Sequence, residues 1–388
     1  MRVLRVIPSL NPRVGGPAVA GLNSVISLSR SGVEAEIAVI VRPRERTASW
    51  WGELEDRCAH EGVRLRFFPT TTPWLTSNPY DPSAALTRWL FKQPGGRYDL
   101  IHVESPWTGA CAIASMYAAY RSIPLVLSPN AVFMPPELSK GRVPFRTVKR
   151  FGLRAYARAA STVVCSSALE ARDAARSGVS RRKLTWIYHA VVDDLVPFQA
   201  SAQAQSTDGL RVGYLGRLHP VKNVELLIDA IGQVGGDMTL QVAGRGDTEF
   251  EADLMRRARQ LLGERAQFNG WVDESSKAAF FAGNDVLVMP SQYECFGVAA
   301  VESLAAGVPV IVSDRAGVAD IVRTHRVGTV VPPTVTGISG ALRRYRDDRR
   351  ALAADRSSAR HAALAESGFA AHARRLLAAY GRVLERRT

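Results

Sequence analysis

The 388 residues predict two domains, and with 46% apolar residues each domain can bury a core. The sequence has no run of about 20 apolar residues, Pro8 interrupts its short apolar start, and its four cysteines stand far apart without neighbouring metal ligands. These features argue against a membrane-spanning, exported or metal-stabilised protein and predict a cytoplasmic one. The net charge of +14 favours anionic partners such as phosphates, acidic lipids or nucleic acid.

Short apolar runs alternate with helical stretches through the first half of the chain. Such alternation is typical of a parallel sheet covered by helices on both faces. The predicted strands are residues 3–7, 35–41, 65–68, 100–103, 125–127 and 162–165.

A small, polar segment at residues 200–209 has neither helical nor strand periodicity and is typical of a linker. The alternation then restarts with predicted strands at residues 212–215, 239–243, 267–268, 286–289 and 308–312. The sequence therefore predicts an α/β protein of two Rossmann-like domains with doubly wound parallel sheets that face a central cleft. We place the N-terminal domain at residues 1–199, the linker at 200–209, the second domain at 210–360 and a C-terminal helical tail, packed back on the N-terminal domain, at 361–388.

The segment at residues 290–302 is the clearest candidate for chemistry, because it follows a predicted strand and opens a helix. Gly297 permits close approach of the backbone, and the free N–H groups at the helix start, near Phe296 to Ala299, offer donors to an anion. A diphosphate or sugar hydroxyls would suit this position.

Glu294 and Glu302 flank that helix start. In one continuous helix they would lie about 12 Å apart along the axis, whereas the paired carboxylates of a glycoside hydrolase lie about 5–9.5 Å apart. We therefore expect separate roles, with Glu294 accepting hydrogen bonds from donor-sugar hydroxyls and Glu302 accepting them from a ribose.

This pattern of glutamate, seven residues and glutamate after Pro–Ser resembles the signature of retaining glycosyltransferases of the GT-B fold, of the family 4 (group 1) type found in polysaccharide biosynthesis. Residues 213–223 also resemble that family, whose Gly–Arg and downstream Lys–Asn meet the donor diphosphate; here these are Gly216, Arg217 and Lys222. Positive charge stabilises a leaving diphosphate more in the transition state than in the ground state. The resemblance implies that the catalytic residues are Arg217, Lys222 and Glu294.

The resemblance extends to two more loops on the donor side. Residues 242–247 resemble the family's Gly-x-Gly turn, and residues 268–272 resemble the segment that meets the nucleobase. The Gly-x-Gly turn lacks the third glycine of a dinucleotide fingerprint, which argues against a dehydrogenase. The implied donor-binding residues are Gly16, Gly216, Gly244, Asn269, Gly270, Phe296, Gly297, Val298 and Glu302.

The implied acceptor side lies in the first half and departs from the family pattern at two positions. Gly15 and Gly16 resemble the family's paired-glycine loop, and His102 stands in the strand that usually ends in His-x-His, with Glu104 in place of the second histidine. Asn130 replaces the histidine of Pro–His–Gly and cannot shuttle a proton. His102 also fits a buried strand-end histidine with its hydrogen bonds satisfied.

Basic residues recur at nearly every fourth position of a predicted helix, namely Arg146, Lys149, Arg150, Arg154 and Arg158. Such a stripe is usually only solvated. On an acceptor domain it could also contact anionic lipid headgroups at about 1 kcal/mol per charge. No nucleic-acid recognition motif accompanies the charge, so we expect no nucleic-acid partner.

We therefore expect a retaining hexosyltransferase that moves sugar from a nucleoside-diphosphate sugar to a glycan or lipid-linked acceptor. We expect it to act in cell-surface polysaccharide or glycolipid assembly, in the cytoplasm or peripherally on the inner face of the plasma membrane. No cofactor or metal is needed, because Arg217 and Lys222 can supply the positive charge. The alternatives are a sugar-nucleotide hydrolase or epimerase of the same fold, and a non-catalytic sugar-nucleotide-binding partner of a glycan synthase complex.

Overall fold

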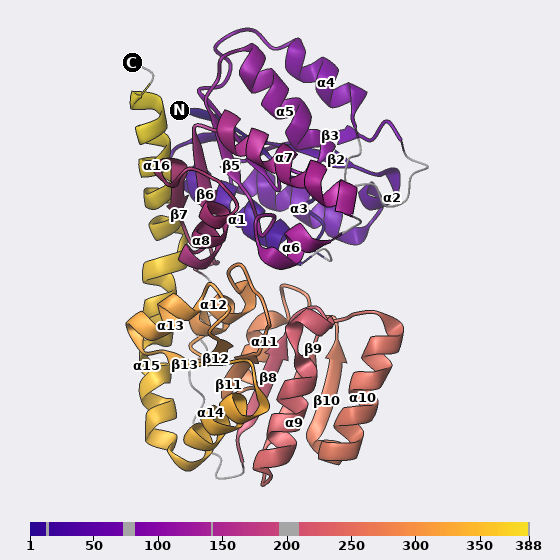
Figure 1. Ribbon diagram of the computed structural model, residues 1–388, viewed down its shortest axis with the longest axis vertical. Coiled ribbons are helices and arrows are strands. Elements are labelled where there is room, and N and C mark those ends of the chain that lie inside the picture. Colours follow the sequence, from indigo (N-terminus) through magenta and orange to yellow (C-terminus); the bar gives the residue numbers. More distant parts are fainter. Residues whose placement is uncertain (13–14, 73–81, 141–142, 194–208, 387–388) are drawn as a thin grey trace. The chain divides into compact units, whose positions relative to one another are not determined.

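The computed structural model describes residues 1–12, 15–72, 82–140, 143–193 and 209–386 (Figure 1). Residues 200–208, nearly all of the predicted linker, lie outside the described residues. The chain forms two compact units. Unit 1 comprises Met1–Ala190 together with Phe369–Thr388, and unit 2 comprises Val191–Gly368.

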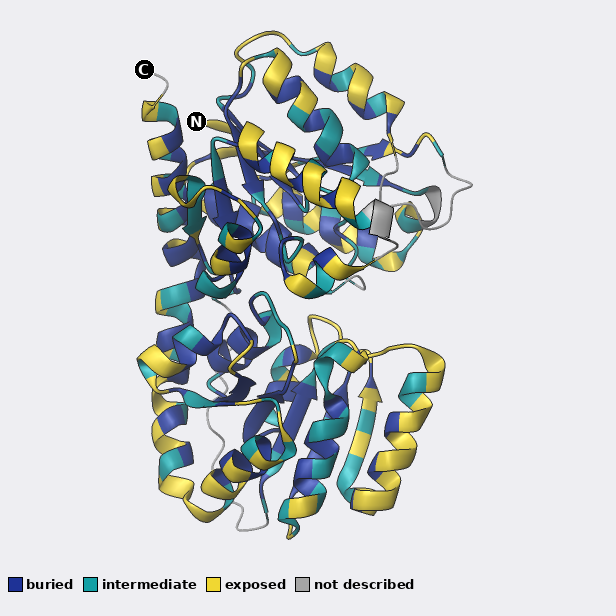
Figure 2. Ribbon diagram, viewed as in Figure 1, coloured by how far each residue is buried: buried dark blue, intermediate teal, exposed yellow. Residues whose placement is uncertain are grey.

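Unit 1 contains a seven-stranded sheet in the order β3-β2-β1-β4-β5-β6-β7, and each pair of neighbouring strands is parallel. The residues of its five inner strands are nearly all buried, as expected for a sheet covered on both faces (Figure 2). The strands are β1 (Arg2–Val6), β2 (Glu34–Val41), β3 (Arg64–Pro69), β4 (Leu100–Glu104), β5 (Leu125–Ser128), β6 (Thr162–Cys165) and β7 (Leu184–Trp186).

Alternate residues along the strands of unit 1 pack into two different cores, one on each face of the sheet. Leu4 packs in a core with α4, α5, α7 and α8, whereas Val3 packs on the opposite face with α1 and the C-terminal helix α16. Helix α16 thus completes one face of the N-terminal sheet (Figure 1). The helices are α1 (Gly16–Arg30), α2 (Pro43–Arg46), α3 (Ser49–His60), α4 (Ala84–Phe91), α5 (Gly109–Tyr120), α6 (Pro135–Ser139), α7 (Val143–Ala159), α8 (Ala168–Arg176) and α16 (Phe369–Glu385), with a 3-10 turn, η2 (Arg181–Lys183).

Unit 2 repeats this plan with a six-stranded parallel sheet in the order β10-β9-β8-β11-β12-β13. Its strands are β8 (Arg211–Leu215), β9 (Thr239–Ala243), β10 (Ala266–Gly270), β11 (Val286–Met289), β12 (Val310–Ser313) and β13 (Gly328–Val331). Its helices are α9 (Val224–Val234), α10 (Thr248–Leu262), α11 (Lys277–Ala282), α12 (Val298–Ala305), α13 (Ala319–His325), α14 (Val335–Asp347) and α15 (Arg349–Ser367), with 3-10 turns η4 (Pro220–Lys222) and η5 (Gly263–Arg265).

The predicted α/β class with two parallel sheets is confirmed, and every predicted strand coincides with an observed one. Two strands were not predicted, the edge strands β7 and β13. Both are short and only partly buried, so neither shows the continuous apolar run of a central strand. Residues 361–368, the first part of the predicted C-terminal tail, lie within unit 2, whereas the chain from Phe369 onward belongs to unit 1.

Candidate functional site

The structure brings Lys222 and Glu294 together, although 72 residues separate them. Lys222 ends the turn after β8, Glu294 lies in the loop after β11, and β8 and β11 are neighbours in the sheet. The Lys222 ammonium forms an ion pair with Glu294 Oε2, and both side chains remain partly exposed. Two of the proposed catalytic residues therefore meet at the carboxyl edge of the sheet, where doubly wound folds bind ligands.

Hydrogen bonds to two backbone carbonyls fix this pairing of the two loops. The N–H of Gln292 donates to the Val221 carbonyl at 2.8 Å, and Asn223 Nδ2 donates to the Pro290 carbonyl at 3.0 Å. Asn223 adopts a left-handed backbone with φ of 53°, a conformation that asparagine tolerates better than most residues. The turn after β8 and the loop after β11 therefore form one unit that holds Lys222 beside Glu294.

A second set of bonds ties Glu294 to the loop after β12. Its N–H donates to the Arg315 carbonyl at 3.2 Å, and its own carbonyl accepts from the Gly317 N–H at 3.0 Å. Gly297 follows as the N-cap of α12 with φ of 107°, and a Cβ there would approach the Met289 side chain to 3.0 Å. Val298 starts the helix, while Phe296 is buried at 1% exposure. Any Phe296 contact with a ligand would therefore have to come from its backbone.

Three of the glycines predicted on the donor side, Gly216, Gly244 and Gly270, lie together at the ends of β8, β9 and β10. The Gly216 N–H donates to the Ala243 carbonyl, and the Gly244 N–H donates to the Gly270 carbonyl at 2.7 Å. A Cβ on Gly244 would come within 1.9 Å of the Gly216 carbonyl oxygen, so only glycine fits there. Gly244 is therefore required by the close packing of the loops, whatever ligand the loops bind. Arg217 and Asn269, beside them, are exposed.

Glu302 lies inside α12 and is buried with a partner that the sequence did not suggest. Its Oε1 accepts from Lys277 Nζ at 2.7 Å, and Lys277 also lies 3.0 Å from Glu274 Oε2. Glu302 is 3% exposed, and the buried ammonium of Lys277 neutralises its carboxylate. A ribose contact by Glu302, as the family resemblance implies, would have to share that carboxylate with Lys277.

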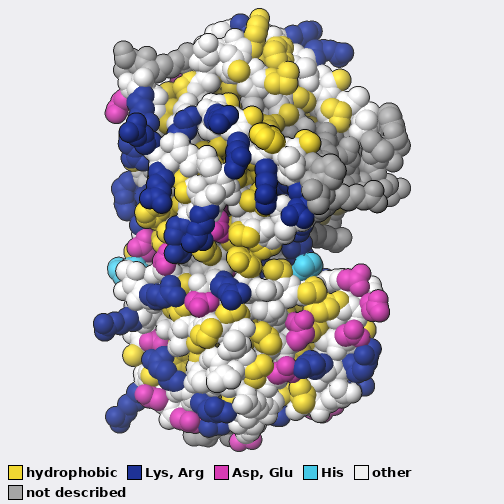
Figure 3. All heavy atoms as spheres, viewed as in Figure 1, with side chains coloured by type: hydrophobic (Ala, Val, Ile, Leu, Met, Phe, Trp, Pro, Cys, Tyr) yellow, Lys and Arg dark blue, Asp and Glu magenta, His cyan; other side chains and the backbone are white. Residues whose placement is uncertain are grey.

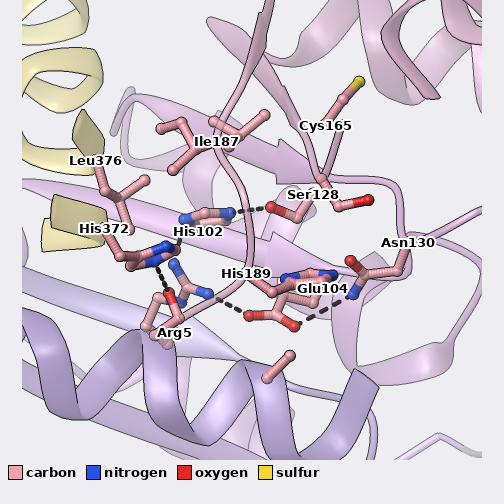
Figure 4. A pocket seen from close by; sticks show the side chains of 14 residues that line it. Arg5, His102, Glu104, Ser128, Asn130, Cys165, Ile187, His189, His372 and Leu376 are labelled. Atoms are coloured by element: carbon pink, nitrogen blue, oxygen red, sulfur yellow. Dashed lines mark hydrogen bonds and ion pairs between the residues drawn. The ribbon is translucent and has the colours of Figure 1, made fainter. Parts of the chain in front are cut away.

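The predicted acceptor-side histidine belongs to a buried polar cluster in unit 1 (Figure 4). Arg5 of β1 stands beside His102 of β4 in the sheet register, and the Arg5 guanidinium also forms an ion pair with Glu104. Tyr380 of α16 accepts from Arg5 at 3.0 Å and lies 2.6 Å from His102 Nδ1. Because a guanidinium only donates, Nδ1 accepts from Arg5, so the proton of His102 is on Nε2, which donates to Ser128 Oγ at 2.8 Å.

Burial, with the charge of Arg5 beside the ring, holds the pKa of His102 well below its usual value. His102 is 1% exposed. It therefore fits the structural alternative, a neutral histidine that crosslinks two strands and α16. The cavity at this cluster has a volume of about 20 Å³, which is room for roughly one water molecule.

Asn130 also lines this cluster, and its amide points toward Glu104 (Figure 4). Its Nδ2 donates to Glu104 Oε2 at 3.2 Å. Because the Glu104 carboxylate only accepts, the amide must present its nitrogen to Glu104, which leaves the carbonyl oxygen for another group. The next residue, Ala131, donates its N–H to Glu170 Oε1 at 2.5 Å, so a second buried carboxylate secures the turn.

Gly15 and Gly16 begin α1, also in unit 1. Gly15 is the N-cap with φ of 107°, and Gly16 is the first helical residue. A Cβ on Gly15 would meet nothing within 4 Å, so its backbone angle, rather than crowding, favours glycine there.

Titration of His372, in α16, should make the free energy of unfolding depend on pH. Its Nδ1–H donates to the Tyr188 carbonyl at 2.8 Å, and in the neutral ring Nε2 accepts from Ser24 Oγ at 2.9 Å. Burial lowers the pKa of His372 to about 4. The unfolded chain therefore binds the proton first as pH falls, and stability is lost between about pH 6.5 and 4, by up to about 1.4 kcal/mol per pH unit for one group.

We expect the denaturant concentration at the midpoint of unfolding to decrease as the pH falls through this range. The decrease should be smaller for the His372→Asn variant. The exposed histidine His60, replaced by asparagine, is the matched control and should leave the slope unchanged. Equal slopes for wild type and His372→Asn would contradict this assignment.

Four residues of these sites were not predicted, namely Arg5, Glu104 as a partner of Asn130, Lys277 and Tyr380. Of these, only Arg5 could have been recognised from the sequence, because a charged residue in the middle of an apolar strand needs a buried partner. Within the described ranges, no group of three or more His, Cys, Asp and Glu could hold a metal ion. No helix among those residues is long and apolar enough to cross a membrane.

Comparisons with known proteins agree with this architecture. The family profile described as "Glycosyl transferases group 1" matches residues 198–362, and that described as "Glycosyl transferase 4-like domain" matches residues 15–189. The "GDP-mannose-dependent alpha-mannosyltransferase" of Mycolicibacterium smegmatis is 28% identical over 363 residues, covering 89% of this chain and 90% of that protein. The protein of the same name from Mycobacterium tuberculosis is 27% identical over 343 residues, covering 86% and 84%.

Two solved structures share the fold. The HepE protein of Anabaena, solved in complex with UDP and glucose, has a TM-score of 0.77 at 18% identity, covering 98% of this chain and 100% of that one. Sucrose-phosphate synthase from Thermosynechococcus elongatus has a TM-score of 0.77 at 20% identity, covering 99% of each chain. At these identities the similarity concerns the fold alone.

The two parallel-sheet units and these neighbours define a protein of the GT-B fold. The chain belongs to the group 1 glycosyl transferases, with a glycosyl transferase 4-like domain in its N-terminal half. The predicted family is thereby confirmed, and the protein is a glycosyltransferase.

Proposed function

We propose that this glycosyltransferase moves a hexose, with retention of configuration, from a nucleoside-diphosphate sugar to a glycan or lipid-linked acceptor of cell-surface polysaccharide or glycolipid assembly. One observation carries the proposal: Lys222 and Glu294 meet beside the start of α12, on the same sheet edge as the glycine turns after β8, β9 and β10. The relatives named as GDP-mannose-dependent and the neighbour solved with UDP support a nucleotide-linked donor.

The pairing suits departure of a diphosphate. A cationic Lys222, with exposed Arg217 after the same strand, stabilises the negative charge that develops on the leaving phosphate. The Glu294 carboxylate, held by three loops, accepts hydrogen bonds from sugar hydroxyls. The start of α12 contributes N–H groups that have no acceptor within the helix and carry partial positive charge.

On the acceptor side, the Asn130 carbonyl oxygen is the free half of an amide whose nitrogen is held by Glu104. It can accept a hydrogen bond from an acceptor hydroxyl but cannot take its proton. In a retaining reaction the departing phosphate takes that proton, so Asn130 is compatible with transfer.

Nucleotide binding is the first test. We expect one of UDP, GDP and ADP, or its sugar conjugate, to raise the melting temperature, because a ligand at 100 times its dissociation constant adds about 2.7 kcal/mol of stability. The Arg217→Ala/Lys222→Ala variant is the control and should lose the shift. If no nucleotide raises the melting temperature, a non-catalytic or differently liganded protein becomes the better assignment.

We also propose that unit 1 contacts anionic membrane surfaces through α7. This helix contains no acidic residue and exposes Arg150, Arg154 and Arg158, while Val148 and Phe151 are 62% and 67% exposed. Lys and Arg side chains gather, with apolar ones between them, over the face where α7 and α8 lie (Figure 3). Cationic and apolar side chains on one exposed helix suit the interface of an anionic bilayer.

Lys149, which was predicted to belong to this stripe, does not. It is 7% exposed, and its Nζ donates to the Glu137 carbonyl at 2.7 Å. Lys149 stands one position from Arg150 and therefore points about 100° away around the helix, toward the core. Arg146 is half-buried at the edge of the stripe.

Liposome flotation tests the membrane contact. The Arg146→Glu/Arg150→Glu/Arg158→Glu variant should bind vesicles containing phosphatidylglycerol at least about tenfold more weakly, since each lost charge costs about 1 kcal/mol. The control changes net charge equally at exposed positions of unit 2, as Arg259→Glu/Arg343→Glu/Arg350→Glu. Equal flotation of the two triple variants would rule out this surface.

A further inference from the structure

A second cavity in unit 1 lies apart from the polar cluster around Arg5. It has a volume of about 210 Å³, between α6, α7 and the end of α8. Three arginines line it, Arg150 and Arg154 from α7 and Arg176 from α8. It is large enough for a phosphate-sized anion, and it is smaller than the roughly 300–1,000 Å³ of pockets that enclose whole drug-sized ligands.

The positive charge of these arginines is poorly neutralised. Arg150 is exposed and takes part in none of the ion pairs found among the described residues. Arg176 lies 3.4 Å from Asp173 Oδ1, with 78% of its side chain exposed. Arg154 uses its Nε to hold the Ser177 carbonyl at 3.0 Å, which offsets the partial negative charge at the end of α8. The cavity therefore presents guanidinium groups without enough carboxylate to satisfy them.

The remaining walls of the cavity are mostly apolar. Phe133, Leu138 and Leu153 line it and are all buried. Guanidinium groups bind phosphate oxygens through paired, charge-assisted hydrogen bonds, whereas apolar walls favour a hydrocarbon group. Together they fit a phosphate that carries an apolar chain better than a free sugar, which would need hydroxyl-binding amides and carboxylates.

The cavity also adjoins the acceptor-side turn. Phe133 follows Asn130 by three residues, and the turn between them is closed by the Met134 N–H donating to the Ala131 carbonyl at 2.9 Å. Ser177 Oγ donates to the Phe133 carbonyl at 3.2 Å, which links the end of α8 to the same segment. A group bound in the cavity would therefore contact the segment that holds Asn130 in place.

We propose that this cavity is a binding site for a phosphate group attached to an apolar chain. Such a group is present both in anionic lipid headgroups of a bilayer and in soluble alkyl phosphate esters. Binding here does not require the transfer chemistry assigned to unit 2, so either assignment can fail without the other.

The experiment measures binding of inorganic phosphate and hexyl phosphate by calorimetry, in an Arg217→Ala/Lys222→Ala background that removes the proposed diphosphate site. We expect hexyl phosphate to bind more tightly than inorganic phosphate, because the walls are apolar. Adding Arg150→Ala/Arg176→Ala should weaken hexyl phosphate binding about tenfold or more. Both arginines are exposed, so the fold should survive their loss.

The matched control is Arg158→Ala/Arg172→Ala. It removes the same two charges from the same two helices at exposed positions outside the cavity, and we expect less than about a twofold change. Equal weakening by both pairs would overturn the site and leave a diffuse positive field as the cause. So would hexyl phosphate binding no tighter than inorganic phosphate.

Vesicles of phosphatidylcholine with and without phosphatidylglycerol distinguish the two sources. If the cavity pair weakens vesicle binding more than the control pair does, the site takes lipid headgroups. If only hexyl phosphate binding depends on the cavity pair, the site takes soluble phosphate esters. Both results support a phosphate site, and equal behaviour of the two pairs in every assay contradicts it.

Discussion

Lys222→Ala should slow glycosyl transfer by about two to three orders of magnitude, the usual effect of removing one preorganised group that stabilises transition-state charge. The ammonium is paired with Glu294 and held by the contacts between the loops after β8 and β11, so it needs little reorganisation on binding. If Lys222 stabilises the charge that develops on the leaving phosphate, as proposed, the loss should appear mainly in kcat.

Glu294→Ala should lose activity to a similar degree, with a larger share in the KM of the donor, since the proposed contact with the sugar exists in the ground state as well. Glu294→Gln keeps a hydrogen-bond acceptor and should fall between the alanine variant and wild type. The double variant Lys222→Ala/Glu294→Ala should be far less impaired than the sum of both losses, because the two residues act as a pair.

Arg257 and Asp229 provide the matched control. They form an ion pair at 2.6 Å in the same unit, away from the glycine turns, and Arg257→Ala should leave transfer within about twofold of wild type. Steady-state kinetics, with the donor identified by melting temperature, would compare all five variants with wild type. Full activity of Lys222→Ala or Glu294→Ala would overturn the assigned catalytic residues.

The second large effect concerns stability. Arg5→Leu should lower the free energy of unfolding of unit 1 by about 3–5 kcal/mol, because it leaves the Glu104 carboxylate buried without its cation. It also removes a donor to Tyr380 and to His102, which together attach α16 to the sheet. Denaturant unfolding followed by circular dichroism would measure the loss.

Two variants separate this explanation from a general loss of packing. The double variant Arg5→Leu/Glu104→Leu removes the uncompensated charge and should recover much of the stability. Arg64→Leu breaks an exposed pair with Glu34 in the same sheet and should cost less than about 1 kcal/mol. If Arg5→Leu costs no more than Arg64→Leu, the buried cluster does not stabilise the fold as described.

Most of the fold could be predicted because its strands are buried on both faces and therefore form uninterrupted apolar runs. The strand at residues 286–289, which is fully buried, shows such a run in the sequence itself. The edge strand β13 (Gly328–Val331) does not, since three of its four residues are only partly buried and contacts with one neighbour decide its pairing.

Part of the donor side could also be predicted, because its residues occur in contiguous loops. The loop that contains Glu294 and Gly297 is a single segment between a strand and a helix, so its spacing is visible in the chain. The Lys277 partner of Glu302 could not be predicted, because 25 residues and a strand separate the two and a surface lysine looks the same in sequence.

The sequence by itself determined two α/β units, the candidate loops at the strand ends and the basic character of α7. The tertiary structure decided which charges are neutralised and which are available. It buried Lys149 while leaving Arg150 exposed, and it joined Arg5 to Tyr380 across 375 residues. The physical reason is that hydrophobic periodicity is local and repeats along the chain, whereas the partner of a buried charge is chosen by the packing of distant elements.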